Sequence, residues 1–103
     1  GNDKFNTGYK VFTLFFSKRF DCYLFYYPKG SLIPRHKDPS FGYRHYRLNI
    51  VLKKPDEGGQ FLCKKMIWSF NNKVYLFRAD DSYHSCTQIT KGTRILLGFG
   101  VRI

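Results

Sequence analysis

Residues 94–102 read RILLGFGVR, and this stretch decides how the chain can fold. In a β-strand, side chains alternate between two faces. One face is apolar and consists of Ile95, Leu97, Phe99 and Val101. The other consists of Arg94, Leu96, Gly98 and Gly100. The arginine followed by glycines leaves room for a small anion beside the strand. The apolar face predicts a homo-oligomer or a covering N-terminal helical segment.

The rest of the chain also consists of strand-like runs. Segments rich in Val, Ile, Phe, Tyr and Leu alternate with Gly, Pro, Asn and Asp, and no long stretch has helical periodicity. The predicted strands are 9–17, 20–27, 32–36, 44–53, 60–64, 66–70, 74–78, 83–89 and 94–102. Many short strands without helices are typical of a sandwich or a jelly roll. We therefore predict an all-β fold in one domain spanning residues 1–103.

Composition narrows the class of protein further. Hydrophobic residues make up 43% of the chain, which argues against disorder. The three widely spaced cysteines, without a CxxC pair, favour the cytoplasm or another reducing intracellular compartment over a disulfide framework. No apolar run reaches the ~18 residues needed to span a bilayer, so no membrane partner is expected. The formal net charge of +11 attracts nucleic acids and acidic peptides alike.

The stretch IPRHKDPS, residues 33–40, carries a candidate metal site. If the strand continues, the i, i+2 spacing puts His36 and Asp38 on the same side of the backbone. A divalent ion would need another protein ligand, and His84, at the start of a predicted strand, is a better candidate than His45. We expect His45 in a loop, facing solvent or substrate. Two histidines and a carboxylate on one face of an ion form the facial triad of non-heme Fe(II) oxygenases.

A basic residue, Arg94, follows His84 after ten residues. The order His36-x-Asp38, His84, Arg94 resembles the prolyl-hydroxylase-like 2-oxoglutarate- and Fe(II)-dependent dioxygenases. YYPKGSLIPRHKD is similar to the approach to the metal in this family, and the resemblance covers about residues 23–99. It implies a double-stranded β-helix, a cupin-like jelly roll with few or no helices. It also implies that the triad binds Fe(II) and that Arg94 pairs with the distal carboxylate of 2-oxoglutarate.

This assignment requires a particular topology, because Arg94 must lie close to His84. In a flat hairpin, Arg94 would stay about five residues from the strand that carries His84, or roughly 17 Å at ~3.3 Å per residue. One small diacid could not bridge that distance. The chain must therefore cross between sheets at Lys91 and Gly92, as in a jelly roll.

Tyr27 and Asn49 are further candidates for cosubstrate contact. Tyr27 stands at the position of the family's tyrosine and could donate its phenol to a carboxylate, or could simply pack in the core. Asn49 shares a strand face with Arg47 and Val51, and its amide could reach the cosubstrate or bond to a neighbouring strand. Substrate contacts are expected from the loop beside the metal, at Phe41, Tyr43, Arg44 and His45. A surface loop without function is the alternative.

The reaction implied by the resemblance is hydroxylation of a C–H bond. It consumes 2-oxoglutarate and dioxygen and forms succinate and carbon dioxide, in a cavity supplied by the protein. The short interval from His84 to Arg94 favours a protein or peptide substrate. Nucleic-acid demethylases of the same superfamily usually carry Asn two residues before Tyr27 and a second Arg six residues after Arg94. This chain has Phe25 and Gly100 there.

Three alternatives stay open. The first is an oxygenase that acts on nucleic acid, because the net charge favours a polyanionic partner. The second is a basic β-barrel that binds single-stranded nucleic acid without catalysis. The third is an oxygenase fold retained as an inactive scaffold. The presence of all three candidate metal ligands argues against this alternative.

Overall fold

The computed structural model describes residues 8–38 and 42–103, which form strands and turns but no helix. The strands are β1 (Lys10–Phe16), β2 (Phe20–Tyr27), β3 (Ile33–His36), β4 (His45–Lys53), β5 (Glu57–Gly58), β6 (Phe61–Cys63), β7 (Met66–Phe70), β8 (Val74–Arg78), β9 (His84–Cys86), β10 (Ile89–Lys91) and β11 (Arg94–Arg102). The predicted all-β class is confirmed. In the described part of the chain, no helix has the length and apolar character needed to cross a membrane.

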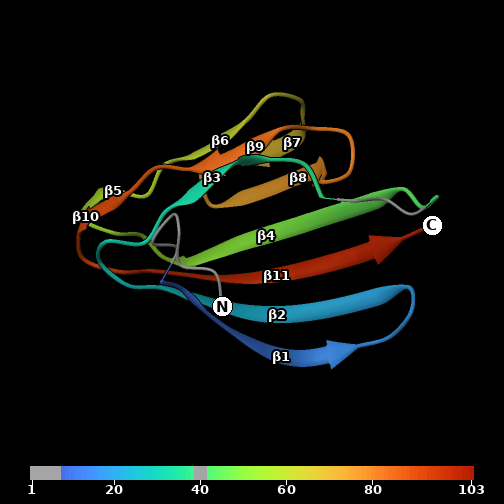
Figure 1. Ribbon diagram of the computed structural model, residues 1–103, viewed down its shortest axis with the longest axis horizontal. Coiled ribbons are helices and arrows are strands. Elements are labelled where there is room, and N and C mark those ends of the chain that lie inside the picture. Colours follow the sequence, from blue (N-terminus) through green and yellow to red (C-terminus); the bar gives the residue numbers. More distant parts are fainter. Residues whose placement is uncertain (1–7, 39–41) are drawn as a thin grey trace.

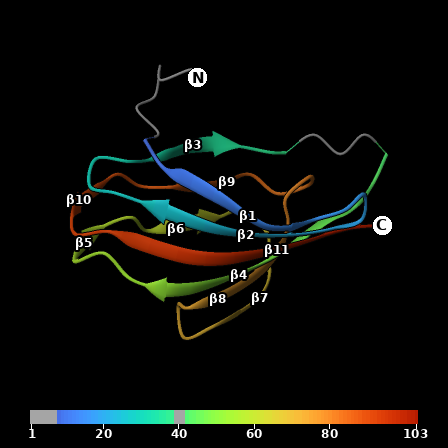
Figure 2. The same cartoon turned by 90° about the horizontal axis from the view of Figure 1, so that it is seen from below.

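The strands form two main layers (Figures 1 and 2). One is a six-stranded sheet in the order β1-β2-β11-β4-β8-β7, and the other is a three-stranded sheet in the order β3-β9-β6. The short strands β5 and β10 pair at one end of the molecule. All of these strand pairs are antiparallel. The candidate site lies between the two layers.

The alternation of β11 sets its two faces. Arg94, Leu96, Gly98 and Gly100 are buried between the layers, whereas the residues between them are half-buried or exposed. Leu96 packs in a small apolar cluster with Tyr27 and Ile89, against which Phe25 and Ile33 also pack. This cluster supports the inner side of the site, and the apolar side of β11 faces outward.

The segment after β9 corrects the predicted strand at 83–89. That strand is divided into β9, which pairs with β3 and β6, and β10, which pairs with β5. Residues 55–59, which lie between two predicted strands, contain β5. Gly58 permits this pairing, because it has a φ of +77° and a Cβ there would collide with the Gln88 carbonyl. Glycine is the residue that tolerates both conditions.

The chain crosses between the layers where the sequence required it. β9 belongs to the three-stranded sheet and β11 to the six-stranded sheet, so residues 87–93 carry the chain from one layer to the other. Gly92 has a φ of +85°, and a Cβ there would lie 2.9 Å from the backbone nitrogen of Asp56. The predicted crossing at Lys91 and Gly92 is confirmed, and it places Arg94 opposite the strand of His84.

Candidate metal centre and its cavity

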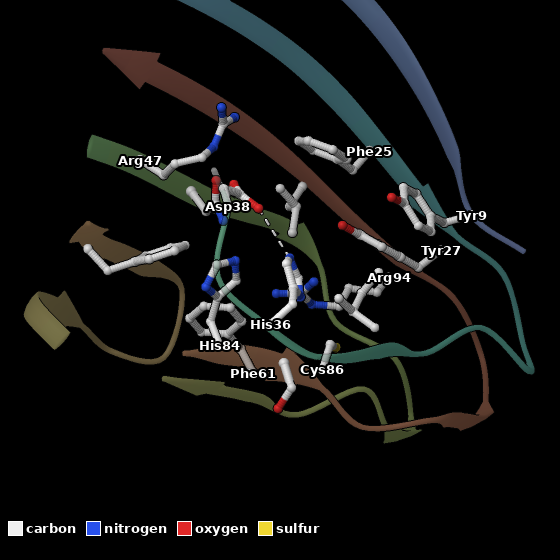
Figure 3. Close-up of a pocket in the computed structure, with 15 residues that line it drawn as sticks. Tyr9, Phe25, Tyr27, His36, Asp38, Arg47, Phe61, His84, Cys86 and Arg94 are labelled. Atoms are coloured by element: carbon white, nitrogen blue, oxygen red, sulfur yellow. Dashed lines mark ion pairs between the residues drawn. The ribbon is translucent and has the colours of Figure 1, made fainter. Parts of the chain in front are cut away.

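The side chains of His36, Asp38 and His84 meet between the two layers (Figure 3). One ligand atom from each lies within 4.8 Å of the others. His36 is the last residue of β3 and His84 the first of β9, and the two are paired across these strands. Nε2 of His36 is 3.3 Å from Oδ1 of Asp38. The fold therefore brings together all three ligands expected from the sequence.

Asp38 reaches the site from beyond the end of a strand. β3 ends at His36, so the strand does not continue to Asp38 as the spacing argument assumed. Instead, the backbone N–H of Asp38 donates to the carbonyl of Ala79, with an N···O distance of 2.9 Å. This bond ties the segment after β3 to the segment after β8, and it keeps the carboxylate beside the imidazoles.

Both histidines present the same ring nitrogen to the site. Nδ1 of His36 lies 2.8 Å from the carbonyl oxygen of Pro34, and Nδ1 of His84 lies 2.9 Å from that of Ser82. A carbonyl can only accept, so each Nδ1 carries a proton and each neutral ring keeps its lone pair on Nε2. Metal-binding histidines commonly have such a partner, because it fixes the tautomer and the ring orientation.

The protonation states also suit a cation. Burial lowers the pKa of His84. Burial alone would raise the pKa of Asp38, but the hydrogen bond with His36 and the nearby histidine charges lower it overall. The hydrogen bond to Asp38 raises the pKa of His36. At neutral pH, Asp38 is therefore ionised and His84 is neutral, as ligands must be.

Arg94 extends into the same cavity from the first position of β11. It is 4% exposed, and no ion pair or hydrogen bond reaches its guanidinium from the residues that the structure describes. Tyr27, its partner across β2 and β11, places its ring centroid 5.3 Å from the guanidinium carbon. A buried charge without a counter-ion is costly, so this arrangement favours an anionic ligand.

Tyr27 combines the two roles considered for it. Its ring packs on Tyr9 and Phe25, with centroid distances of 5.1 and 6.1 Å. It also lines the cavity with Arg94. Burial raises the pKa of Tyr27 well above its ordinary value, although Arg94 opposes the shift. The phenol therefore keeps its proton and is a hydrogen-bond donor at neutral pH.

The cavity has a volume of about 200 Å³. This is the room of about seven water molecules at ~30 Å³ each, which suits a compact acid. Asn49 lines it, and its buried Oδ1 has no hydrogen-bond partner in the described part of the chain. The amide is therefore not committed to a neighbouring strand.

Arg47 also lines the cavity, although no functional role was predicted for it. The signal was present, because Arg47 lies two residues before Asn49 and shares its strand face. An arginine on the inward face of a buried strand needs an anionic partner or a ligand.

The expected substrate contacts are not placed together. Phe41 lies outside the described residues, and Tyr43 and Arg44 are not among the residues that line the cavity. His45 was expected in a loop, but it begins β4. Its Nδ1 is 3.9 Å from Oδ2 of Asp38, and its side chain is 13% exposed. The predicted strand 44–53 already included His45, and the structure confirms it there, paired with β11, so the expectation of a loop at this residue is wrong.

Comparison of the sequence with protein-family models and with curated proteins gives no match. Comparison with solved structures gives several matches. KdgF from Halomonas sp. superposes with a TM-score of 0.63 and 9% identity, over 93% of this chain and 81% of that chain. An RmlC-like cupin from Desulfovibrio desulfuricans superposes with a TM-score of 0.57 and 16% identity, over 88% and 80% of the two chains. The fold is a cupin jelly roll.

One of the similar solved structures is a 2-oxoglutarate-binding hydroxylase. The viral collagen prolyl hydroxylase from Paramecium bursaria Chlorella virus-1, solved in complex with 2-oxoglutarate, superposes with a TM-score of 0.58 and 19% identity. The match covers 91% of this chain and 59% of that chain. At these identities the similarity shows the cupin fold alone, and the chemistry has to be argued from the residues of the cavity.

Proposed function

We propose that this chain is an Fe(II)- and 2-oxoglutarate-dependent oxygenase that hydroxylates a C–H bond of a protein or peptide. One observation carries the proposal. The buried guanidinium of Arg94, without an anionic partner in the described residues, shares a cavity with a triad of two histidines and one carboxylate. A metal site alone would suit many cupin chemistries, whereas a metal site with a buried cation for an acid suits this one.

The donor set fits Fe(II). His36, Asp38 and His84 would hold the ion through two neutral imidazoles and one carboxylate, which is the ligand set of non-heme Fe(II) oxygenases. With three protein ligands on one side, the ion would keep open positions for dioxygen and the cosubstrate and would supply the oxidising chemistry. The Nδ1–H bonds to Pro34 and Ser82 keep the rings oriented for this task.

The other end of the cavity fits 2-oxoglutarate. The planar fork of Arg94 matches a carboxylate with two parallel hydrogen bonds. The phenol of Tyr27 is protonated and can donate a further bond, and Asn49, which lines the same cavity, could donate another through its amide N–H. These three residues would therefore bind and orient the diacid.

Aromatic side chains shield the His84 side of the centre from water. The ring of Phe77 is 1% exposed and lies 5.0 Å from the ring of His84, measured between centroids. Phe61 packs on the same imidazole at 6.3 Å and on Phe77 at 5.2 Å. Excluding water strengthens the electrostatic contacts of the bound acid and protects reactive species from side reactions.

The space around Gly100 supports a peptide rather than a nucleic-acid substrate. Nucleic-acid demethylases that resemble this chain usually carry a second arginine at this position. Here a Cβ would lie 2.5 Å from Nη1 of Arg47 and 2.6 Å from Oδ1 of Asp21, so a larger side chain would have to displace this ion pair. The net charge of +11 still favours the nucleic-acid alternative, and the experiment below includes it.

The experiment is turnover with Fe(II), 2-oxoglutarate and dioxygen. We expect slow formation of succinate without substrate and faster formation with a competent peptide, which should gain one oxygen atom by mass spectrometry. Methylated oligonucleotides are tested in parallel for loss of a methyl group. Asp38→Ala should abolish succinate formation, and Lys53→Gln, a change at an exposed position of β4, should not.

Two results would contradict the proposal. Succinate formation that persists in Asp38→Ala would show that the triad is not the oxidation site. If neither Fe(II) nor 2-oxoglutarate stabilises the fold, while salt-sensitive oligonucleotide binding survives in Asp38→Ala, the chain is a non-catalytic binding module.

A further inference from the structure

A second buried guanidinium, that of Arg47, enters the cavity on the far side of the metal ligands from Arg94. Arg94 begins β11 opposite Tyr27, whereas Arg47 on β4 is paired with Gly100 near the other end of β11. In Figure 3, Asp38 is drawn between the two arginines. A diacid held by Arg94 and the metal would therefore leave Arg47 free to face another ligand.

The charges around Arg47 do not balance. Oδ1 of Asp21 accepts from Nη1 of Arg47 at 2.9 Å, and Oδ2 accepts from Nη1 of Arg102 at 2.5 Å. One carboxylate therefore faces two guanidinium groups. Arg102 satisfies its other nitrogens on the carbonyls of Lys18 and Ser17. The two arginines together keep one excess positive charge, and Arg47, which is 8% exposed, is the more buried of the two.

Arg47 also has a buried donor that no residue uses in the described part of the chain. Its buried Nη2 has no hydrogen-bond partner among the described residues, and the same is true of Oδ1 of Asn49. The two atoms lie side by side over Gly98, where a Cβ would be 2.8 Å from Nη2 and 3.0 Å from Oδ1. Buried polar groups are nearly always satisfied in folded proteins, so the unused guanidinium donor of a cavity-lining residue indicates a ligand.

We propose that Arg47 binds a carboxylate of the substrate, through Nη2, while Nη1 stays on Asp21. The carboxylate belongs to the C-terminus of the peptide or to an acidic side chain next to the oxidised residue. This inference rests on the proposed function, because 2-oxoglutarate then occupies Arg94 and leaves Arg47 to the substrate. The excess of basic residues would steer such acidic peptides to the cavity.

The test uses matched acids and amides as probes. The full chain is loaded with Mn(II) in place of Fe(II), to prevent turnover, and with saturating 2-oxoglutarate, to occupy Arg94. Acetylglycine and acetylglycinamide, which differ in charge but hardly in shape, are then titrated by NMR. We expect the acid to bind at least tenfold more tightly. Acetylalanine carries its carboxylate at the C-terminus, and acetylaspartamide carries it in the side chain. Comparing these two probes shows which kind of substrate carboxylate Arg47 binds.

The variants are chosen so that folding survives. Arg47→Gln alone would leave Asp21 short of a partner, whereas the double variant Asp21→Asn with Arg47→Gln removes both charges and keeps the net charge at +11. It should lose the preference for the acid. Asp21→Asn alone is the matched control and should retain or increase it, because Arg47 then lacks its internal carboxylate.

The outcomes separate this inference from the proposed function, because binding of 2-oxoglutarate is measured first in the same samples. If 2-oxoglutarate binds but wild type binds acetylglycine and its amide equally, the carboxylate site is overturned and the oxygenase proposal stands. A preference that persists in the folded double variant also overturns it. If 2-oxoglutarate does not bind while the preference depends on Arg47, the carboxylate site stands and the oxygenase proposal fails.

Discussion

His36 and His84 face each other from paired strands, with ring centroids 4.4 Å apart, and each donates its Nδ1–H to the carbonyl two residues earlier in the chain. The same local contact therefore fixes both rings. Because both Nδ1 atoms are held by backbone carbonyls, each ring has its Nε2 available for a cation beside Asp38, and an ion would displace the proton that His36 shares with Asp38.

This preorganisation predicts strong stabilisation by a divalent metal. An ion present at one hundred times its dissociation constant stabilises the fold by about 2.7 kcal/mol. For a domain of this size, that corresponds to a rise of about 10–20 °C in Tm. Thermal unfolding with Mn(II) measures the shift, and His84→Ala or Asp38→Ala should remove it.

Lys37, which lies between His36 and Asp38 in the sequence, provides the control for this prediction. The ammonium of Lys37 is 4.7 Å from the ring centroid of Tyr83, outside the metal centre. Lys37→Gln should keep the full metal-induced shift. A shift of the same size in His84→Ala would mean that the ion binds elsewhere.

The candidate metal ligands could be predicted from sequence, whereas the contacts of Arg47 could not, and the reason is physical. His36 and Asp38 are close in sequence, and their spacing with His84 and Arg94 resembles a known pattern. The role of Arg47 depends on the register that pairs it with Gly100 and on the approach of Asp21 from β2. Such long-range pairing leaves no local pattern in one sequence.

Asp80 should make the fold sensitive to acid. Hydrogen bonds from Arg78 lower the pKa of Asp80 to about 2, against an opposing effect of burial, and the backbone N–H of His45 adds a further bond. A depressed pKa means that the ionised form stabilises the native state above about pH 4, and that this stabilisation is lost as the pH falls toward 2.

Asp80→Asn tests this linkage. At pH 7 it should lower the free energy of unfolding by about 1 kcal/mol, because a hydrogen bond to a charged group is replaced by a neutral one. Urea unfolding measures the difference between wild type and variant, which should shrink toward zero near pH 2. A difference that does not change with pH would show that Asp80 acts by packing alone.

Gly100→Ala should break the cluster of Asp21 and Arg47. The new Cβ would lie 2.5 Å from Nη1 of Arg47 and 2.6 Å from Oδ1 of Asp21, so the ion pair must move. Overpacking of this kind costs about 1–3 kcal/mol. Urea unfolding should show that loss, whereas Val101→Ala, which changes the outward face of β11, should cost less. Wild-type stability in Gly100→Ala would contradict the close packing of the cluster.

The outward face of the six-stranded sheet predicts self-association. Phe12, Leu24, Leu97, Ile50, Val74 and Phe70 follow one another in register across all six strands. The ends of this row are open to solvent, since Phe12 is 52% exposed and Phe70 is 61% exposed. A continuous apolar surface of this kind is unusual on a monomer, and a second copy of the same face would cover it.

Leu97 lies at the centre of this row, so Leu97→Lys is the sharpest test. A lysine there should weaken self-association about thirtyfold or more, because changes at the centre of an interface cost ~2 kcal/mol or more. The fold should survive, since the side chain points outward. Sedimentation velocity over a range of concentrations measures the association. Thr90→Lys, an exposed change on β10, is the control and should associate like wild type. A wild-type chain that stays monomeric at every concentration would show that this face does not pair with itself.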